Sequence, residues 1–120
     1  MRLVRKSQMD ALFSSGKSFI AYPLRVVFLK KEKTPENEIA IMVSVSKRKF
    51  KRAVKRNRTK RLIRENFRTQ RHELENMLKT SPFSLNIGFL FLKDELSDYE
   101  EINKAMAKAL TLLKAKIFDN

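Results

Sequence analysis

The spacing of apolar and polar residues along the chain predicts three helices and four strands. Residues 1–6 are expected to form a loose basic arm, and a short helix with Ser7 as its cap ends at Gly16. Runs of β-branched and aromatic residues predict strands at residues 19–21, 24–30, 39–45 and 86–93. The last run is apolar almost throughout, so we expect a central strand that is covered on both faces. A polar segment at residues 31–38 predicts a hairpin loop.

A stretch without Pro or Gly predicts a long helix from about residue 51 to residue 79, ended by Pro82. Its apolar positions recur mostly at steps of three, four or seven residues, which places them on one face. This stripe comprises Ala53, Lys60, Ile63, Phe67, Leu74 and Leu78, with the Lys60 ammonium reaching out to water. A last helix, capped by Ser97 or Asp98, carries a core-facing stripe from Ile102 to Leu113.

The order α-β-β-β-α-β-α predicts an α+β fold, in which a four-stranded sheet and its helices form a two-layer sandwich. With 120 residues, the chain is expected to form a single domain, residues 1–120. The long helix connects the strands at 39–45 and 86–93. If these strands are parallel neighbours, general rules favour a right-handed crossover between them.

Positive charge is concentrated in the long helix and in the turn before it. Between Lys47 and Arg71, thirteen Lys and Arg residues stand against one acid, Glu65, which makes a net charge of +12. The whole chain carries +14, so all remaining residues together contribute only +2. Helices that face only water usually alternate the sign of their charges. A field of one sign in one place is typical of a nucleic-acid contact.

Polar residues of the long helix form a second row, rotated away from the apolar stripe. Asn57, Arg61, Arg64 and Arg68 recur at steps of four, three and four residues. Guanidinium groups hold phosphate oxygens in a fixed fork geometry, so this row predicts a phosphate-binding surface.

The same residues resemble a known family. The string RAVKRNRTKRLIRE (residues 52–65), centred on Arg56, Asn57 and Arg58, resembles the signature helix of the bacterial ribonuclease P protein subunit. The preceding VSVSKR (residues 43–48) resembles the strand end that leads into that helix. The resemblance implies a protein that binds the catalytic RNA and the 5′ leader of precursor tRNA and so supports 5′ maturation of tRNA. It also implies a left-handed crossover.

The charge pattern and the resemblance together predict the residues that bind RNA. They are Lys47, Arg48, Lys51, Arg52, Lys55, Arg56, Asn57, Arg58, Lys60, Arg61, Arg64 and Arg68. In the family, aromatic residues of the first helix border a cleft for the leader. Phe13 falls at one such place, and Met9 falls where a second aromatic is common, so both are predicted to line this cleft. A ring stacks on a base, and a thioether offers soft apolar contact.

The composition disfavours a protein nuclease, which needs metal ligands or a positioned acid–base pair. The chain has one histidine, His72, and no cysteine, and its acids near residue 98 fit the start of a helix. We therefore expect no catalytic residue, metal or cofactor in the protein. The resemblance implies that the RNA subunit carries the chemistry and holds Mg2+.

Short apolar runs and the lack of a secretory signal predict a cytoplasmic protein without a membrane partner. The expected partners are ribonuclease P RNA and precursor tRNA, with no protein partner required. The main alternative is a ribosomal-protein-like domain that binds rRNA, which would share the size and basicity. A DNA-binding module is disfavoured because no helix-turn-helix spacing is evident.

Overall fold

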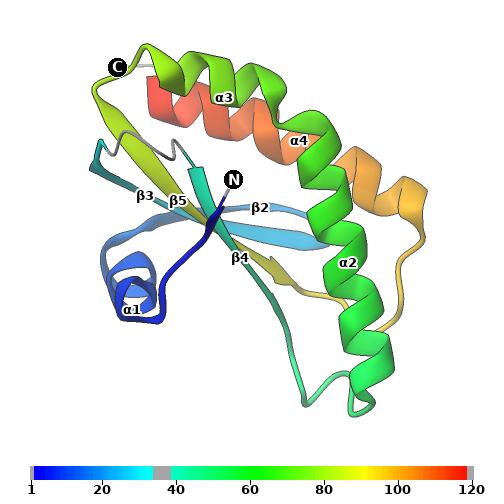
Figure 1. The fold of residues 1–120 in the computed structure, drawn as a ribbon. Helices are drawn as coiled ribbons and strands as arrows, with labels where there is room; N and C mark the ends of the chain where they lie inside the picture. Colours follow the sequence, from blue (N-terminus) through cyan, green and yellow to red (C-terminus); the bar gives the residue numbers. More distant parts are fainter. Residues whose placement is uncertain (1, 34–38, 119–120) are drawn as a thin grey trace.

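The computed structural model describes residues 2–33 and 39–118, which form one mixed sheet with helices packed on it (Figure 1). The strands stand in the order β1-β4-β5-β3-β2. They are β1 (Arg2–Leu3), β2 (Lys17–Ala21), β3 (Leu24–Glu32), β4 (Ile39–Val45) and β5 (Phe83–Phe91). The helices are α1 (Lys6–Ser15), α2 (Ala53–Gln70), α3 (His72–Lys79) and α4 (Tyr99–Phe118).

The predicted α+β class is confirmed, and the four predicted strands are all present. β4 and β5 pair in parallel, from Ile39 opposite Leu85 to Val45 opposite Phe91, and the chain between them runs through α2 and α3. The sequence left this pairing open, and the structure shows that the two strands form a β-α-β unit. The left-handed sense of its crossover stays a prediction.

The start of the chain differs from the predicted loose arm. Arg2–Leu3 pairs in parallel with β4 as a short edge strand, and the Val4 amide adds a hydrogen bond to the Ile41 carbonyl. α1 begins at Lys6, so Arg5 takes the N-cap position and Ser7 lies inside the helix. Residue 1 and most of the predicted hairpin loop, residues 34–38, lie outside the described residues.

The predicted long helix is two helices, because the ribbon bends at Arg71 between α2 and α3 (Figure 1). Ile63 and Phe67 before the bend and Leu74 and Leu78 after it are all buried in the same core. The bend therefore lets one apolar stripe follow the core along two axes.

At the start of the stripe, Thr59 is the buried residue, whereas Ala53 is exposed and Lys60 half-buried. The prediction that Ala53 extends the stripe is therefore wrong, whereas the partial burial of Lys60 agrees with a stem along the core and an ammonium that reaches water. The hydroxyl of Thr59 donates to the Lys55 carbonyl at 3.0 Å, which satisfies this buried polar group within the helix.

The two faces of the sheet are covered unequally. One face carries the main core, where Phe89 of β5 packs on Phe67 of α2 with ring centroids 5.5 Å apart. The other face receives α1, whose Leu12 is fully buried and lies against Gly88 of β5. One ten-residue helix spans only part of this face, and Ile20 of the neighbouring β2 remains 58% exposed. The sheet is thus left open beside α1.

Gly16, at the end of α1, is required by a close backbone approach. Its φ of −73° is ordinary, so the left-handed cap typical of helix-ending glycines is absent here. A Cβ at this position would lie 2.2 Å from the Leu12 carbonyl oxygen and 2.9 Å from that of Phe28. Backbone atoms on both sides leave no flexible group to move away.

We expect Gly16→Ala to lower the free energy of unfolding by about 1–3 kcal/mol, measured by urea denaturation. Gly88→Ala is the matched control. Its Cβ would meet side-chain atoms of Leu12 and Met42 at 3.4 Å, which is ordinary contact, and it should change stability by less than about 1 kcal/mol. Equal losses in the two variants would contradict the steric explanation.

Candidate nucleic-acid interface

The turn of residues 46–52, between β4 and α2, is anchored by a buried ring. Phe50 is 5% exposed and packs on Phe91 with ring centroids 5.9 Å apart. The Phe50 amide donates to the Ser46 carbonyl at 3.0 Å, and the Lys49 ammonium donates to the Leu92 carbonyl. The turn is therefore fixed to the end of β5. Four of the predicted RNA-binding residues project from it, all exposed: Lys47, Arg48, Lys51 and Arg52.

Arg56 braces this turn from the first turn of α2. Its Nη1 donates to the Phe50 carbonyl at 2.7 Å and to the Lys51 carbonyl at 2.9 Å. The side chain is half-buried, in contrast to its exposed neighbours Lys55 and Arg58. The charge of Arg56 thus supports the backbone that carries the other cations, a role that sequence spacing did not show.

The predicted polar row is one continuous surface. Asn57, Arg61, Arg64 and Arg68, together with Glu65, line a single shallow hollow of about 420 Å³ on the exposed side of α2. Within residues 2–33 and 39–118, no carboxylate oxygen comes within 4.0 Å of Arg61 or Arg64. These two guanidinium groups are therefore available to an anionic partner.

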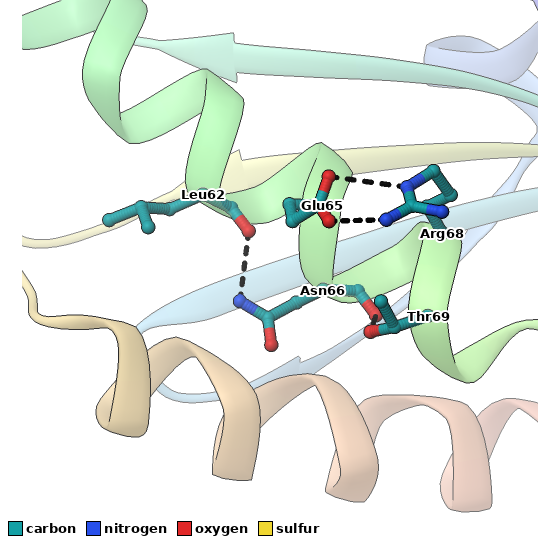
Figure 2. Close-up of polar contacts among 5 residues, drawn as sticks. All are labelled: Leu62, Glu65, Asn66, Arg68 and Thr69. Atoms are coloured by element: carbon teal, nitrogen blue, oxygen red, sulfur yellow. Dashed lines mark hydrogen bonds and ion pairs between the residues drawn. The ribbon is translucent and has the colours of Figure 1, made fainter.

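Arg68 differs from the rest of the row because Glu65 neutralises it. Its Nη2 lies 2.5 Å from Oε1 of Glu65, and its Nε donates to Oε2 at 3.2 Å (Figure 2). The hydrogen bond from Arg68 holds the pKa of the Glu65 carboxyl below its usual value, so the pair stays ionised at neutral pH. The uncompensated charge of the hollow is thus centred on Arg61 and Arg64.

The rotation of α2 is fixed by a buried amide that the sequence analysis missed. Asn66 is fully buried, and its Nδ2 donates to the Leu62 carbonyl at 2.9 Å (Figure 2). Its Oδ1 accepts a hydrogen bond of 3.0 Å from Nδ2 of Asn103 on α4. The signal available in the sequence was its position, three residues after Ile63 on the buried side. This contact points the row of Arg61 away from the core.

The remaining predicted residues lie apart from this row. Lys51, Arg52 and Lys55 border a separate hollow of about 270 Å³, whose lining also includes Asp94 and Glu95. Arg58 is exposed and Lys60 half-buried, and neither belongs to the lining of these two hollows. The structure therefore divides the predicted RNA-binding residues between the end of the turn and the outer side of α2.

A further hollow, of about 240 Å³, lies on the opposite face of the sheet, beside α1. Its lining is Phe13, Gly16, Ser18, Arg25, Val27 and Leu90. Phe13 is 46% exposed, so its ring is not part of the core. Nη2 of Arg25 donates to the Ser18 hydroxyl at 3.3 Å on the wall of the hollow. Met9 is half-buried and lies one helical turn before Phe13 on α1, but it is not among these lining residues.

The described part of the chain lacks two other features. No helix in it is long and apolar enough to cross a membrane. Residues 2–33 and 39–118 contain no group of three or more His, Cys, Asp or Glu side chains placed to hold a metal ion together.

The brace formed by Arg56 can be tested against its exposed neighbour. We expect Arg56→Ala to lower the free energy of unfolding by roughly 1–3 kcal/mol, because two carbonyl groups lose a charged donor. Arg58→Ala removes the same charge from an exposed side chain and should change stability by less than about 0.5 kcal/mol. Thermal or urea denaturation of both variants measures the difference. A stable Arg56→Ala protein would show that the turn holds without the brace.

Comparisons with known proteins agree on one family. The family model described as Ribonuclease P matches residues 1–114. The ribonuclease P protein component of Porphyromonas gingivalis is 37% identical over 116 residues, which cover 97% of this chain and 85% of that protein.

Solved structures show the same fold. The RNase P protein of Staphylococcus aureus superposes with a TM-score of 0.70 at 21% identity, over 94% of both chains. That of Thermotoga maritima superposes with a TM-score of 0.67 at 24% identity, over 95% of this chain and 96% of its own. The family match, which spans nearly the whole chain, and the shared fold lead to one conclusion: this chain belongs to the ribonuclease P protein component family.

Proposed function

We propose that this chain is the RNA-binding, non-catalytic subunit of ribonuclease P and supports 5′ maturation of precursor tRNA. The observation that carries the proposal is the convergence of Asn57, Arg61 and Arg64 on one hollow of α2, where the one lining acid, Glu65, is paired with Arg68 and no carboxylate of the described residues comes within 4.0 Å of Arg61 or Arg64. Membership of the ribonuclease P protein family supports a role in that enzyme, and it favours this role over that of a ribosomal-protein-like domain.

The row on α2 is proposed to bind the phosphates of ribonuclease P RNA. Arg61 and Arg64 supply the charge, while Asn57 offers an amide that both donates and accepts, so it can fix the orientation of the bound strand. The Asn66–Asn103 contact holds the helix in one rotation, which keeps the row aimed before RNA arrives. Cations at this surface also reduce the repulsion between two RNA molecules, the catalyst and its substrate.

The hollow beside Phe13 is proposed to receive the 5′ leader of precursor tRNA. A single strand binds well where an exposed ring stacks on a base and a cation lies near the backbone. Phe13 supplies the ring, and Arg25 supplies a guanidinium held by Ser18. Because this hollow and the α2 row lie on different elements, leader and catalytic RNA can bind at the same time.

The acidic side chains at the start of α4 make structural contacts, which supports a non-catalytic role. The Glu101 carboxylate accepts hydrogen bonds from the Ser97 hydroxyl and from the Lys93 ammonium, the latter at 3.0 Å. These hydrogen bonds lower the pKa of the Glu101 carboxyl. The Glu101 amide donates to Asp98 Oδ1 at 2.8 Å, which caps α4 as the sequence predicts. His72 is exposed at the start of α3. We propose that Mg2+ and the cleavage chemistry belong to the RNA subunit.

Reconstitution tests this function directly. Purified protein alone should leave precursor tRNA intact, whereas protein with its cognate ribonuclease P RNA should cleave it, and His72→Ala should retain activity in the holoenzyme. Cleavage by RNA-free protein that is lost on changing Asp98 or Glu101 would overturn the proposal.

The α2 row makes a separate prediction about salt. Arg61→Ala and Arg64→Ala should each weaken binding to ribonuclease P RNA and flatten the plot of log K against log salt by about 0.9 per lost phosphate contact. Glu65→Gln should act in the opposite direction, because it frees Arg68. Melting temperatures should stay unchanged, since exposed charges contribute little to stability. Lys108→Ala, an exposed cation on α4, is the control and should keep the parent slope.

Phe13→Ala tests leader binding. The ring is half-exposed, so the variant should lose well under the roughly 3 kcal/mol of stability expected for a buried Phe. The holoenzyme should lose about 1–3 kcal/mol of affinity for substrate with a leader and none for leaderless tRNA. Met9→Ala, on the same helix but outside the hollow, should show no leader-specific loss. Equal losses on both substrates would remove Phe13 from the leader site.

A further inference from the structure

A second group of cations lies at the end of the sheet where β2 begins, outside both proposed sites. Lys17 of β2, Lys30 of β3 and Lys116 of α4 are exposed and line one hollow of about 200 Å³, together with Ser15, Phe28 and Leu29. A neighbouring hollow of about 450 Å³ shares Lys17, Phe28 and Lys116 and adds Ser18. β2 and β3 are consecutive strands, whereas α4 is the last helix, so only the fold brings Lys116 to the other two lysines.

The hollows occur where β3 extends past its neighbour. β2 pairs with β3 from Lys17, opposite Phe28, to Ala21, opposite Leu24. From Leu29 to Glu32, no described strand lies along this edge of β3. The β2–β3 ladder ends after five residue pairs, which leaves a recess at the edge of β3 beyond Phe28, and the lysines stand around it.

The charge of this recess is not neutralised by nearby acids. The Lys30 ammonium lies 4.6 Å from the ring centroid of Phe83, and that of Lys116 lies 5.7 Å from the ring centroid of Phe19. A ring face holds an ammonium group in place without cancelling its charge. Lys114, two residues before Lys116, is instead paired with Glu73 at 2.8 Å.

Across the described residues, no carboxylate oxygen comes within 4.0 Å of the three lysines of the recess. Glu32, further along β3, is the one acid on that stretch of the strand and is exposed. Three cations against one solvated acid give the recess a net positive charge that suits an anion.

The recess adjoins the hollow beside Phe13. Ser18 lines both the Phe13 hollow and the larger cationic hollow, and Gly16 of the first lies between Ser15 and Lys17 of the smaller one. Lys17 and Phe28 point to the α4 face of the sheet and Ser18 to the α1 face, so a strand that passes Phe13 reaches Lys17 by turning around the sheet edge at the start of β2. The α2 row is made by other elements and is not part of this path.

We propose that Lys17, Lys30 and Lys116 form a phosphate subsite for the part of a single-stranded leader that extends beyond the Phe13 hollow. This inference rests on the proposed function. Lysine ammonium groups are point charges, so they bind backbone phosphate without selecting a base. The subsite thus adds affinity for long leaders of any sequence, in the manner of a charged groove that follows a strand.

The test uses the holoenzyme and precursor tRNAs whose leaders are lengthened one nucleotide at a time. The double variant Lys17→Gln/Lys116→Gln is compared with Lys104→Gln/Lys108→Gln, which removes two exposed cations of α4 outside the recess. Parent and control should gain affinity once the leader passes the recess, and the double variant should not. For the longest leader, the slope of log K against log salt should be lower in the double variant by roughly 0.7 per lost phosphate contact. Leaderless and short-leader substrates should bind equally to all three proteins.

Two results would overturn the subsite. In the first, the double variant binds like the parent at every leader length. In the second, it loses as much affinity for leaderless substrate as for long-leader substrate, which would mean that the lysines contact the tRNA body or the RNA subunit. Failure of the leader-binding function itself has a different signature. The parent holoenzyme would then show no dependence on the leader, and Phe13→Ala would bind like the parent.

Discussion

The packing of α2 on the sheet, centred on Phe67 against Phe89, is the contact on which the interface depends. Burying this side of the helix forces the opposite side, with Asn57, Arg61 and Arg64, toward solvent. A helix held only by apolar contacts can still rotate or slide. The buried Asn66–Asn103 hydrogen bond removes that freedom, because turning α2 would leave a desolvated amide without its partner. The packing of α2 on the sheet therefore both stabilises the fold and orients the cationic row toward solvent.

The cations of this protein perform two different tasks. Several of them hold the backbone: Arg56 braces the turn before α2, Lys49 ties that turn to Leu92, and Lys33 donates to the Leu78 carbonyl at the end of α3 at 2.6 Å. Others, such as Arg61 and Arg64, make no such contact with the described residues, and they repel one another at a net charge of +14. A polyanion would relieve that repulsion on binding, which supports the proposed RNA partner.

The unequal cover of the sheet separates the proposed binding surfaces. α2 and α4 close one face over the main core, whereas α1 seals only the middle of the other through Leu12 and Gly88. The open remainder forms the hollow beside Phe13 and leads to the recess at the edge of β3. The short β2 is responsible for that recess, since a longer strand would have paired with β3 beyond Phe28.

Local pattern by itself determined the four longer strands and the order of the helices between them, but not β1 or the break between α2 and α3. It also determined the apolar stripe of Ile63 and Phe67 and the row of Arg61 and Arg64, because a helix repeats at a fixed angle. The sequence also located the concentrated positive charge and contains the string of residues 52–65 that resembles the family's signature helix. Only the tertiary structure decided the bend at Arg71 and the pairing of Arg2–Leu3 with β4. It also assigned Arg56 to the turn and joined Lys17 to Lys116. These features depend on contacts between segments far apart in the chain or on the backbone geometry of a turn, and neither leaves a periodic trace in the sequence.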